Sequence, residues 1–149
     1  MRSNRPLTQF AIRKLREFLT YEYRQFTPAE EGNTAVALHF EGDWQVLSFW
    51  LHGERILEIV FDGPTFAGLN VYDGNFYNRA GNPSTTTCER LNGLLDELGE
   101  QCLIPEGVRV FTDKQSGTTF VGRGDRRRPL GRDFEPVSID SNSITLEFS

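Results

Sequence analysis

The chain has 149 residues, and its 38% hydrophobic content, with twelve phenylalanines, is enough for one compact core. No run approaches the roughly 18 apolar residues that cross a bilayer, and the first residues lack the apolar region of a secretory signal. These features predict a cytoplasmic protein with no membrane partner. Two cysteines, Cys88 and Cys102, are too few for a disulfide framework, and we expect reduced thiols at or near the core.

Charge is unevenly distributed along the chain, although the net charge is only −5. Residues 1–26 carry six basic and two acidic side chains, whereas residues 27–108 carry three basic and thirteen acidic ones. Residues 109–132 return to seven basic against two acidic, and the remaining residues carry four acidic and no basic side chains. This pattern is either ordinary variation of surface charge or a sign that two basic segments meet on one face.

The first predicted element is an amphipathic helix over residues 6–24. Apolar residues recur there at steps of three and four, and charged residues fill the positions between them. Ser3 or Asn4 can cap the helix, and Pro6 suits its first turn, where a missing N–H costs nothing. The segment TPAEEGN then breaks the periodicity.

Three strands are predicted next, at Thr34–Phe40, Trp44–Leu51 and Arg55–Val60. The intervening segments EGD and HGE are short enough for hairpin turns, which favours an antiparallel meander. The middle strand, WQVLSFWL, is apolar at nearly every position and therefore suits a central strand with both faces covered. A fourth strand near Leu69–Tyr72 precedes a loop rich in turn formers, DGNFYNRAGNP.

A second helix is predicted over Ser84–Leu98. Thr86 and Glu89 have the spacing of a capping box, and Gly99 is placed to end the helix. Its apolar stripe predicts core positions at Leu91, Leu94, Leu95 and Leu98. The alternative role of the helix N-terminus is to bind an anion, with hydroxyl and basic side chains supplied by Thr86, Thr87, Arg79 and Arg90.

Four further strands are predicted at Val108–Thr112, Thr118–Val121, Val137–Ile139 and Ile144–Phe148. The last two flank the turn sequence DSNS and are expected to form a C-terminal β-hairpin. Together these elements predict one compact α+β domain over residues 1–149, with an antiparallel sheet and two packed helices.

Two short motifs stand about thirty residues apart: LHGERIL, residues 51–57, and STTTCERLNGLL, residues 84–95. Together they resemble a small domain family that is common in bacteriophage and other mobile-element genomes. The family has an LHGNPI-like strand followed by a T-x-T-T-x-x-R-L-N helix start. The second motif is matched by Thr86, Thr87, Arg90, Leu91 and Asn92, while Ser84 replaces a usual threonine and Glu54-Arg55 replaces Asn-Pro. The resemblance covers about residues 34–112 and implies an α+β fold and a viral or mobile-element origin, without an activity to inherit.

No catalytic or metal-binding signature is present in the sequence. His39 and His52 lack partners at metal-ligand spacing, and no serine lies in a nucleophile elbow. Cys88, at a helix N-terminus, could have a lowered pKa, but no base is recognisable near it in sequence. The sequence therefore indicates no cofactor and no metal, although an enzyme that uses dispersed carboxylates such as Asp62 or Asp73 stays open.

An arginine-rich loop is predicted over residues 122–132. Its five arginines are interrupted by glycine and proline, and guanidinium groups suit phosphate contacts; they are Arg123, Arg126, Arg127, Arg128 and Arg132. Tyr72, Phe76 and Tyr77 could supply stacking surfaces for bases. The acidic total charge argues against nucleic acid, and a solvated loop or one paired with acidic residues of another subunit is the alternative.

These observations favour a non-enzymatic binding protein of bacteriophage type that acts on a host or viral macromolecule. Nucleic acid would contact the arginine-rich segment and the N-terminal basic helix. The alternative is a protein partner, such as a host defence or transcription component. Such a partner would contact the acidic middle segment, which would act as a mimic of nucleic acid. A small enzyme is the third hypothesis.

Overall fold

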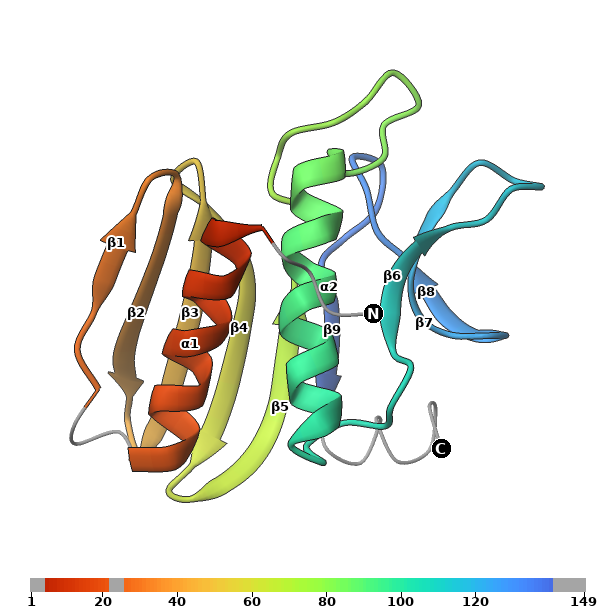
Figure 1. Cartoon of the computed structure of the whole chain (residues 1–149). Helices are drawn as coiled ribbons and strands as arrows, with labels where there is room; N and C mark the ends of the chain where they lie inside the picture. The colour runs from red at the N-terminus through yellow and green to blue at the C-terminus, as the bar shows by residue number, and fades with distance from the viewer. Residues whose placement is uncertain (1–4, 22–25, 141–149) are drawn as a thin grey trace.

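Two helices lie on one face of a six-stranded antiparallel sheet (Figure 1). The computed structural model describes residues 5–21 and 26–140. The helices are α1 (Pro6–Tyr21) and α2 (Thr85–Glu100). The sheet has the order β1-β2-β3-β4-β5-β9, with β1 (Ala29–Glu31), β2 (Thr34–Glu41), β3 (Trp44–Leu51), β4 (Glu54–Asp62), β5 (Thr65–Val71) and β9 (Val137–Asp140). The predicted α+β class and the antiparallel meander are confirmed.

A second, three-stranded antiparallel sheet contains β6 (Arg109–Thr112), β7 (Thr119–Arg123) and β8 (Arg126–Pro129). Figure 1 shows α2 between α1 and this small sheet. The prediction of a loop over residues 122–132 is wrong in its central part, because β8 pairs with β7 across a tight turn. Alternation of apolar and polar residues, which identifies strands in sequence, is lacking in the run Arg126–Pro129.

Four further expectations differ from the structure or fall outside it. The segment TPAEEGN, expected only to end the helical periodicity, contains the short edge strand β1. Strand β5 begins at Thr65, four residues before the predicted start. Residues 22–24 of the predicted first helix lie outside the described residues. The same holds for the predicted strand Ile144–Phe148, so of the C-terminal hairpin the structure describes β9 alone.

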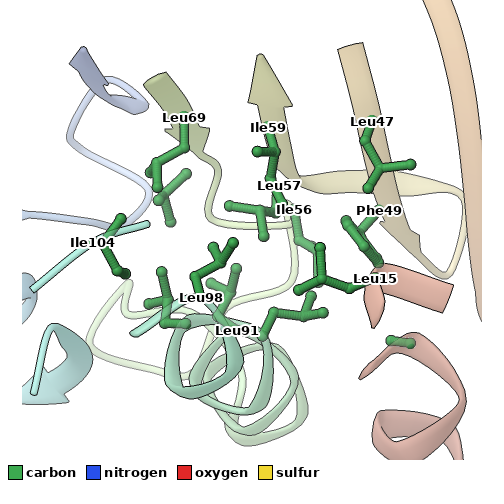
Figure 2. Close-up of a cluster of buried hydrophobic side chains, with 14 of the residues drawn as sticks. Leu15, Leu47, Phe49, Ile56, Leu57, Ile59, Leu69, Leu91, Leu98 and Ile104 are labelled. Carbon is green, nitrogen blue, oxygen red and sulfur yellow. The ribbon is translucent and has the colours of Figure 1, made fainter. Parts of the chain in front are cut away.

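The main core lies between the two helices and the six-stranded sheet. Figure 2 shows Leu91 and Leu98 of α2 pointing toward the sheet residues Leu57 and Leu69. The predicted apolar stripe of α2 is confirmed: Leu91, Leu94, Leu95 and Leu98 are each at most 1% exposed. From α1 the core receives Phe10, Ala11, Leu15 and Phe18. This burial is the main source of the fold's stability.

The opposite face of the six-stranded sheet, which we call the far face, carries a different set of side chains. Side chains alternate along β3, so Leu47 and Phe49 reach the helices, whereas Val46 and Ser48 belong to the far face. Both far-face residues are buried, at 3% and 1% exposure. The apolar character predicted for both faces of the middle strand therefore corresponds to burial of both faces.

A buried arginine ties the two helices to the sheet. Arg90 of α2 is 3% exposed, and its Nε donates to Thr8 Oγ1 on α1 at 2.9 Å. A second guanidinium nitrogen donates to Thr34 Oγ1 on β2. Burial lowers the pKa of Arg90 from its ordinary value. The close approach of the helices also requires Gly93, where an added Cβ would lie 2.4 Å from Thr8 Cγ2.

Two asparagines attach the small sheet to the rest of the molecule. The Asn92 side chain on α2 donates to the Val110 carbonyl at 3.0 Å and accepts from the Val110 N–H at 2.7 Å, as a neighbouring strand would. Asn82 donates to the Gly117 carbonyl and accepts from the Thr119 N–H. Residues 90–92 of the R-L-N motif thus hold the framework together.

Candidate nucleic-acid interface

The outer face of the three-stranded sheet, defined here by Phe111, Phe120 and Arg127, joins aromatic rings to a cation. Phe111 on β6 lies opposite Phe120 on β7, with ring centroids 6.1 Å apart and planes inclined by 33°. The Arg127 guanidinium carbon lies 4.3 Å from the Phe120 centroid and 5.8 Å from that of Phe111. All three side chains are half-buried, so the stack is open to solvent on one side.

The register places a second arginine on the same face. Arg109, Gly122 and Arg127 form one row across the three strands, and Phe111, Phe120 and Pro129 form the next. Arg109 contacts Asp96 at 3.2 Å, yet its side chain is 42% exposed. The Arg127 nitrogen lies 3.7 Å from Asp113 Oδ2, which is longer than a hydrogen bond. A ligand on this face would therefore find planar rings beside cationic donors.

The five predicted arginines do not converge on one surface. Because neighbours along a strand alternate, Arg126 and Arg128 belong to the face opposite Arg127. Arg123 donates to the Glu106 carbonyl at 3.0 Å. Arg132 lies beyond β8, where its backbone N–H donates to the Gly81 carbonyl at 2.9 Å. The hairpin therefore divides the cluster that adjacency in sequence suggested.

The aromatic residues predicted for stacking separate as well. Tyr72 lies on the far face, where its hydroxyl donates to Glu58 at 2.6 Å. Phe76 is 44% exposed, and its ring centroid lies 5.3 Å from that of His52. The Tyr77 hydroxyl donates to Asp73 at 2.9 Å, and Arg79 is exposed on the same loop.

The pKa of both tyrosines is raised to about 12. Burial is the main cause, followed by the hydrogen bond to Glu58 for Tyr72 and to Asp73 for Tyr77. Both phenols are therefore neutral donors at ordinary pH, engaged by carboxylates of the chain itself.

The N-terminus of α2 is capped differently from the prediction. Ser84, not Thr86, is the N-cap, and its side-chain oxygen accepts from the Thr87 N–H at 3.2 Å. Glu89, expected to complete a capping box with Thr86, instead accepts a 2.6 Å hydrogen bond from Thr8 Oγ1. Glu89 faces α1 across the helix interface, which explains why it does not reach back along its own helix.

The anion site suggested for this helix N-terminus loses two of its four side chains. Thr87 is fully buried and shares a hydrogen bond with Ser84, while Arg90 is buried between α1 and β2. Thr86 is half-buried and Arg79 is exposed. Thr86 and Arg79 alone do not form a preorganised anion-binding site.

The other end of α2 also differs from the prediction. Gly99 lies inside the helix, which continues to Glu100 and has Gln101 as its C-cap. The left-handed residue is Cys102, with φ 61°. An added Cβ at Gly99 would make only ordinary contacts with Glu106 and Pro105, at 3.5 Å or more, so neither packing nor the helix end requires a glycine there.

Cys88 and the histidines show no catalytic arrangement. Burial raises the pKa of the Cys88 thiol to about 11, so the lowered pKa considered for this helix position is wrong. Cys102 is exposed, contrary to the expectation of a core or near-core thiol. His39 contacts Glu41 at 3.2 Å, and His52 contacts Asn33 at 3.3 Å.

Within residues 5–21 and 26–140, no group of three or more His, Cys, Asp and Glu side chains is placed to hold a metal ion. No helix in this part of the chain is long and apolar enough to cross a membrane.

Phe111 and Phe120 are the site residues that sequence reasoning missed. The sequence carried a signal for this pair. The predicted strands Val108–Thr112 and Thr118–Val121 each contain a phenylalanine beside a threonine, and a short turn joins them. Counting residues outward from that turn on both strands would have paired the two phenylalanines.

Comparison with protein-family models, curated proteins and solved structures finds no match for this chain. The resemblance to a bacteriophage domain family therefore stays a prediction.

Proposed function

We propose that this chain is a non-enzymatic protein that binds single-stranded nucleic acid through the outer face of its three-stranded sheet. The supporting observation is the Phe111–Phe120 pair beneath Arg127, with Arg109 in the adjacent row. Bases stack on aromatic rings irrespective of sequence, and arginines beside the rings contact phosphates. Unpaired bases are required, because a duplex does not present its base faces to a flat sheet.

Local charge supports the proposal where total charge does not. Residues 109–132, which contain this sheet, carry seven basic and two acidic side chains, whereas the whole chain has a net charge of −5. A polyanion responds to the field near its contact surface, and distant charges are screened beyond about 8 Å at physiological salt. The acidic middle segment therefore weakens the attraction without abolishing it.

The N-terminal basic helix contributes less to this surface than the sequence suggested. On α1, Arg16 pairs with the buried Glu97 at 2.9 Å and Lys14 pairs with Glu17 at 3.0 Å. Figure 1 shows α2 lying between α1 and the three-stranded sheet. We therefore expect charge reversal of the exposed Arg13 to change affinity little.

Fluorescence anisotropy with labelled single- and double-stranded oligonucleotides at about 50 mM salt tests the proposal. The wild type should prefer single strands, with a log–log salt slope of about −0.7 per phosphate contact. Arg127→Glu should weaken binding at least about tenfold, and Phe120→Leu about fivefold or more, because stacking contributes roughly 1 to 3 kcal/mol per base.

Lys114→Glu is the matched control, since it reverses an exposed charge on the β6–β7 turn of the same sheet but lies off the aromatic face. It should weaken binding less than Arg127→Glu. Equal losses for the two variants would reduce the interaction to non-specific attraction. Absence of binding by the wild type at about 50 mM salt would rule out nucleic acid as the partner.

A further inference from the structure

A row of side chains crosses the far face of the six-stranded sheet and contains one gap. The register pairs Glu30 with Ala35, Ala35 with Trp50, and Trp50 with Arg55. Tyr72, the residue directly after β5, follows next, and its ring lies under the Arg55 guanidinium at 4.7 Å. The row thus reads carboxylate, alanine, indole and guanidinium across β1 to β4, and it ends with the phenol of Tyr72.

The alanine position opens into a hollow. This hollow has a volume of about 510 Å³, within the range of small-ligand pockets. Ala35 and Ala37 line it together with Trp50, and Glu30 also contributes to the lining. We call this feature the Ala35 gap, defined by Glu30, Ala35, Ala37 and Trp50.

The rim of the Ala35 gap is held in place by hydrogen bonds. Asn33 and His52 also line the hollow, and the Asn33 side-chain nitrogen lies 3.3 Å from His52 Nε2. Thr34 Oγ1 donates to Asn33 Oδ1 at 2.9 Å, which orients the amide so that its NH₂ group faces the imidazole. In this arrangement the Asn33 amide donates to the His52 ring, and the rim is preorganised.

The chemistry around the gap favours a cation. An indole face attracts guanidinium and ammonium groups, and an exposed carboxylate on the opposite side adds charge attraction. Glu30 is exposed on the edge strand β1, two strands from Trp50, with Ala35 between them. A cation above Ala35 would therefore lie between a carboxylate and an aromatic ring.

Arg55 does not prevent this arrangement. It lies over Trp50 at 5.7 Å from the ring centroid, on the β4 side of the indole, whereas Ala35 is on the β2 side. Its charge is compensated by Glu58, whose Oε2 accepts from Arg55 at 2.8 Å. A cation in the gap would repeat on one side of Trp50 the stacking that Arg55 already makes on the other.

We propose that the Ala35 gap binds an organic cation, a guanidinium or ammonium group, between Glu30 and Trp50. The source of the cation is either a small molecule or a basic side chain of a polypeptide, and the chemistry of recognition is the same for both. This site lies on a different sheet from the outer face assigned to nucleic acid and does not depend on that assignment.

Trp50 supplies a direct signal for the test. The chain has two tryptophans, and Trp44 is 43% exposed, so Trp44→Phe leaves Trp50 as the single indole reporter at little risk to folding. N-acetyl-arginine amide should change the Trp50 fluorescence in a saturable manner. N-acetyl-citrulline amide, which has nearly the same shape without the charge, should bind at least about fivefold more weakly if a cation is recognised.

Two variants locate the site. Glu30→Gln should weaken binding of N-acetyl-arginine amide about threefold to fivefold. Glu31→Gln removes the same charge one residue along, on the other face of β1, and should change binding little. Ala35→Leu should abolish binding by filling the gap, with circular dichroism confirming that the variant is folded. The indole N–H signals in the NMR spectrum of the wild type provide a second readout that needs no substitution.

Comparison of ligands then distinguishes the sources. Tighter binding of an acetylated Gly-Arg-Gly amide than of N-acetyl-arginine amide would identify a polypeptide side chain, and equal or tighter binding of tetramethylammonium would identify a small cation. Equal binding of the two N-acetyl amides, equal effects of the Glu30 and Glu31 substitutions, or no response to N-acetyl-arginine amide would each overturn the proposal.

Discussion

The two sheets of this protein each hold one arginine against two aromatic rings, but they treat its charge differently. On the six-stranded sheet, Arg55 contacts Trp50 and Tyr72 and donates to Glu58 at 2.8 Å. On the three-stranded sheet, Arg127 lies over Phe111 and Phe120, and its nearest carboxylate is 3.7 Å away. The first arginine is bonded to a carboxylate of the fold, whereas the second lies beyond hydrogen-bond distance of Asp113.

Glu58 accounts for most of this difference. It is 6% exposed and also accepts hydrogen bonds from Asn70 at 3.1 Å and from Tyr72 at 2.6 Å. A buried carboxylate needs such donors to offset the cost of leaving water, and its charge in turn binds the guanidinium. Similar cation–aromatic geometry therefore leaves a guanidinium more or less available, according to how closely a carboxylate compensates its charge.

The largest contrast should appear between an apolar residue of the main core, on α2, and one on the outer face of the three-stranded sheet. Leu94→Ala, on the fully buried side of α2, should lower the free energy of unfolding by about 2 to 5 kcal/mol through lost burial and the cavity it leaves. Phe120→Ala should cost only about 1 to 2 kcal/mol, because that ring is half-exposed. Urea denaturation measures both, and equal shifts would mean that the outer face is a second core rather than an open surface.

Removal of the carboxylates tests the comparison directly. Glu58→Ala should lower the free energy of unfolding by about 3 kcal/mol, since it deprives Arg55, Asn70 and Tyr72 of their shared acceptor. Asp113→Ala should cost less, about 1 kcal/mol, because its carboxylate accepts hydrogen bonds from Gln115 N–H and Ser116 Oγ within the β6–β7 turn and lies 3.7 Å from Arg127. The same Asp113 variant should bind single-stranded oligonucleotides somewhat more tightly, as it removes a negative charge beside Arg127. A large loss of stability in the Asp113 variant would contradict the proposed availability of Arg127.

The smallest effect concerns α2, the helix that contacts both α1 and β6. Ser84→Ala removes the N-cap and should cost about 1 kcal/mol, whereas Thr86→Ala should cost less, because Thr86 does not cap the helix. Thermal denaturation followed by circular dichroism measures this difference. Oligonucleotide affinity should be unchanged in both variants, and its loss in either one would return the anion-binding role to the helix N-terminus.

Local periodicity was sufficient to predict most of the framework. The apolar spacing of α1 and α2, and the hairpin turns between β2, β3 and β4, act over a few residues each, so the sequence reports them directly. The same reasoning missed β8, whose arginine run has no alternation, and it chose Thr86 over Ser84 as the cap. Several hydroxyl residues in a row offer equivalent caps, and the contact of Glu89 with Thr8 decides among them.

By itself, the sequence determined the α+β class, the helical core positions and the concentration of positive charge in residues 109–132, because these depend on composition and short-range pattern. Tertiary structure alone decided which charges are available. Arg90 is buried and bonded to Thr8 and Thr34, which are 82 and 56 positions away in sequence. Arg127 faces away from Arg126 and Arg128 because alternate residues of a strand lie on opposite faces of the sheet. The Ala35 gap likewise exists only in the register of neighbouring strands, which joins Glu30 to Trp50 across residues that no local pattern relates.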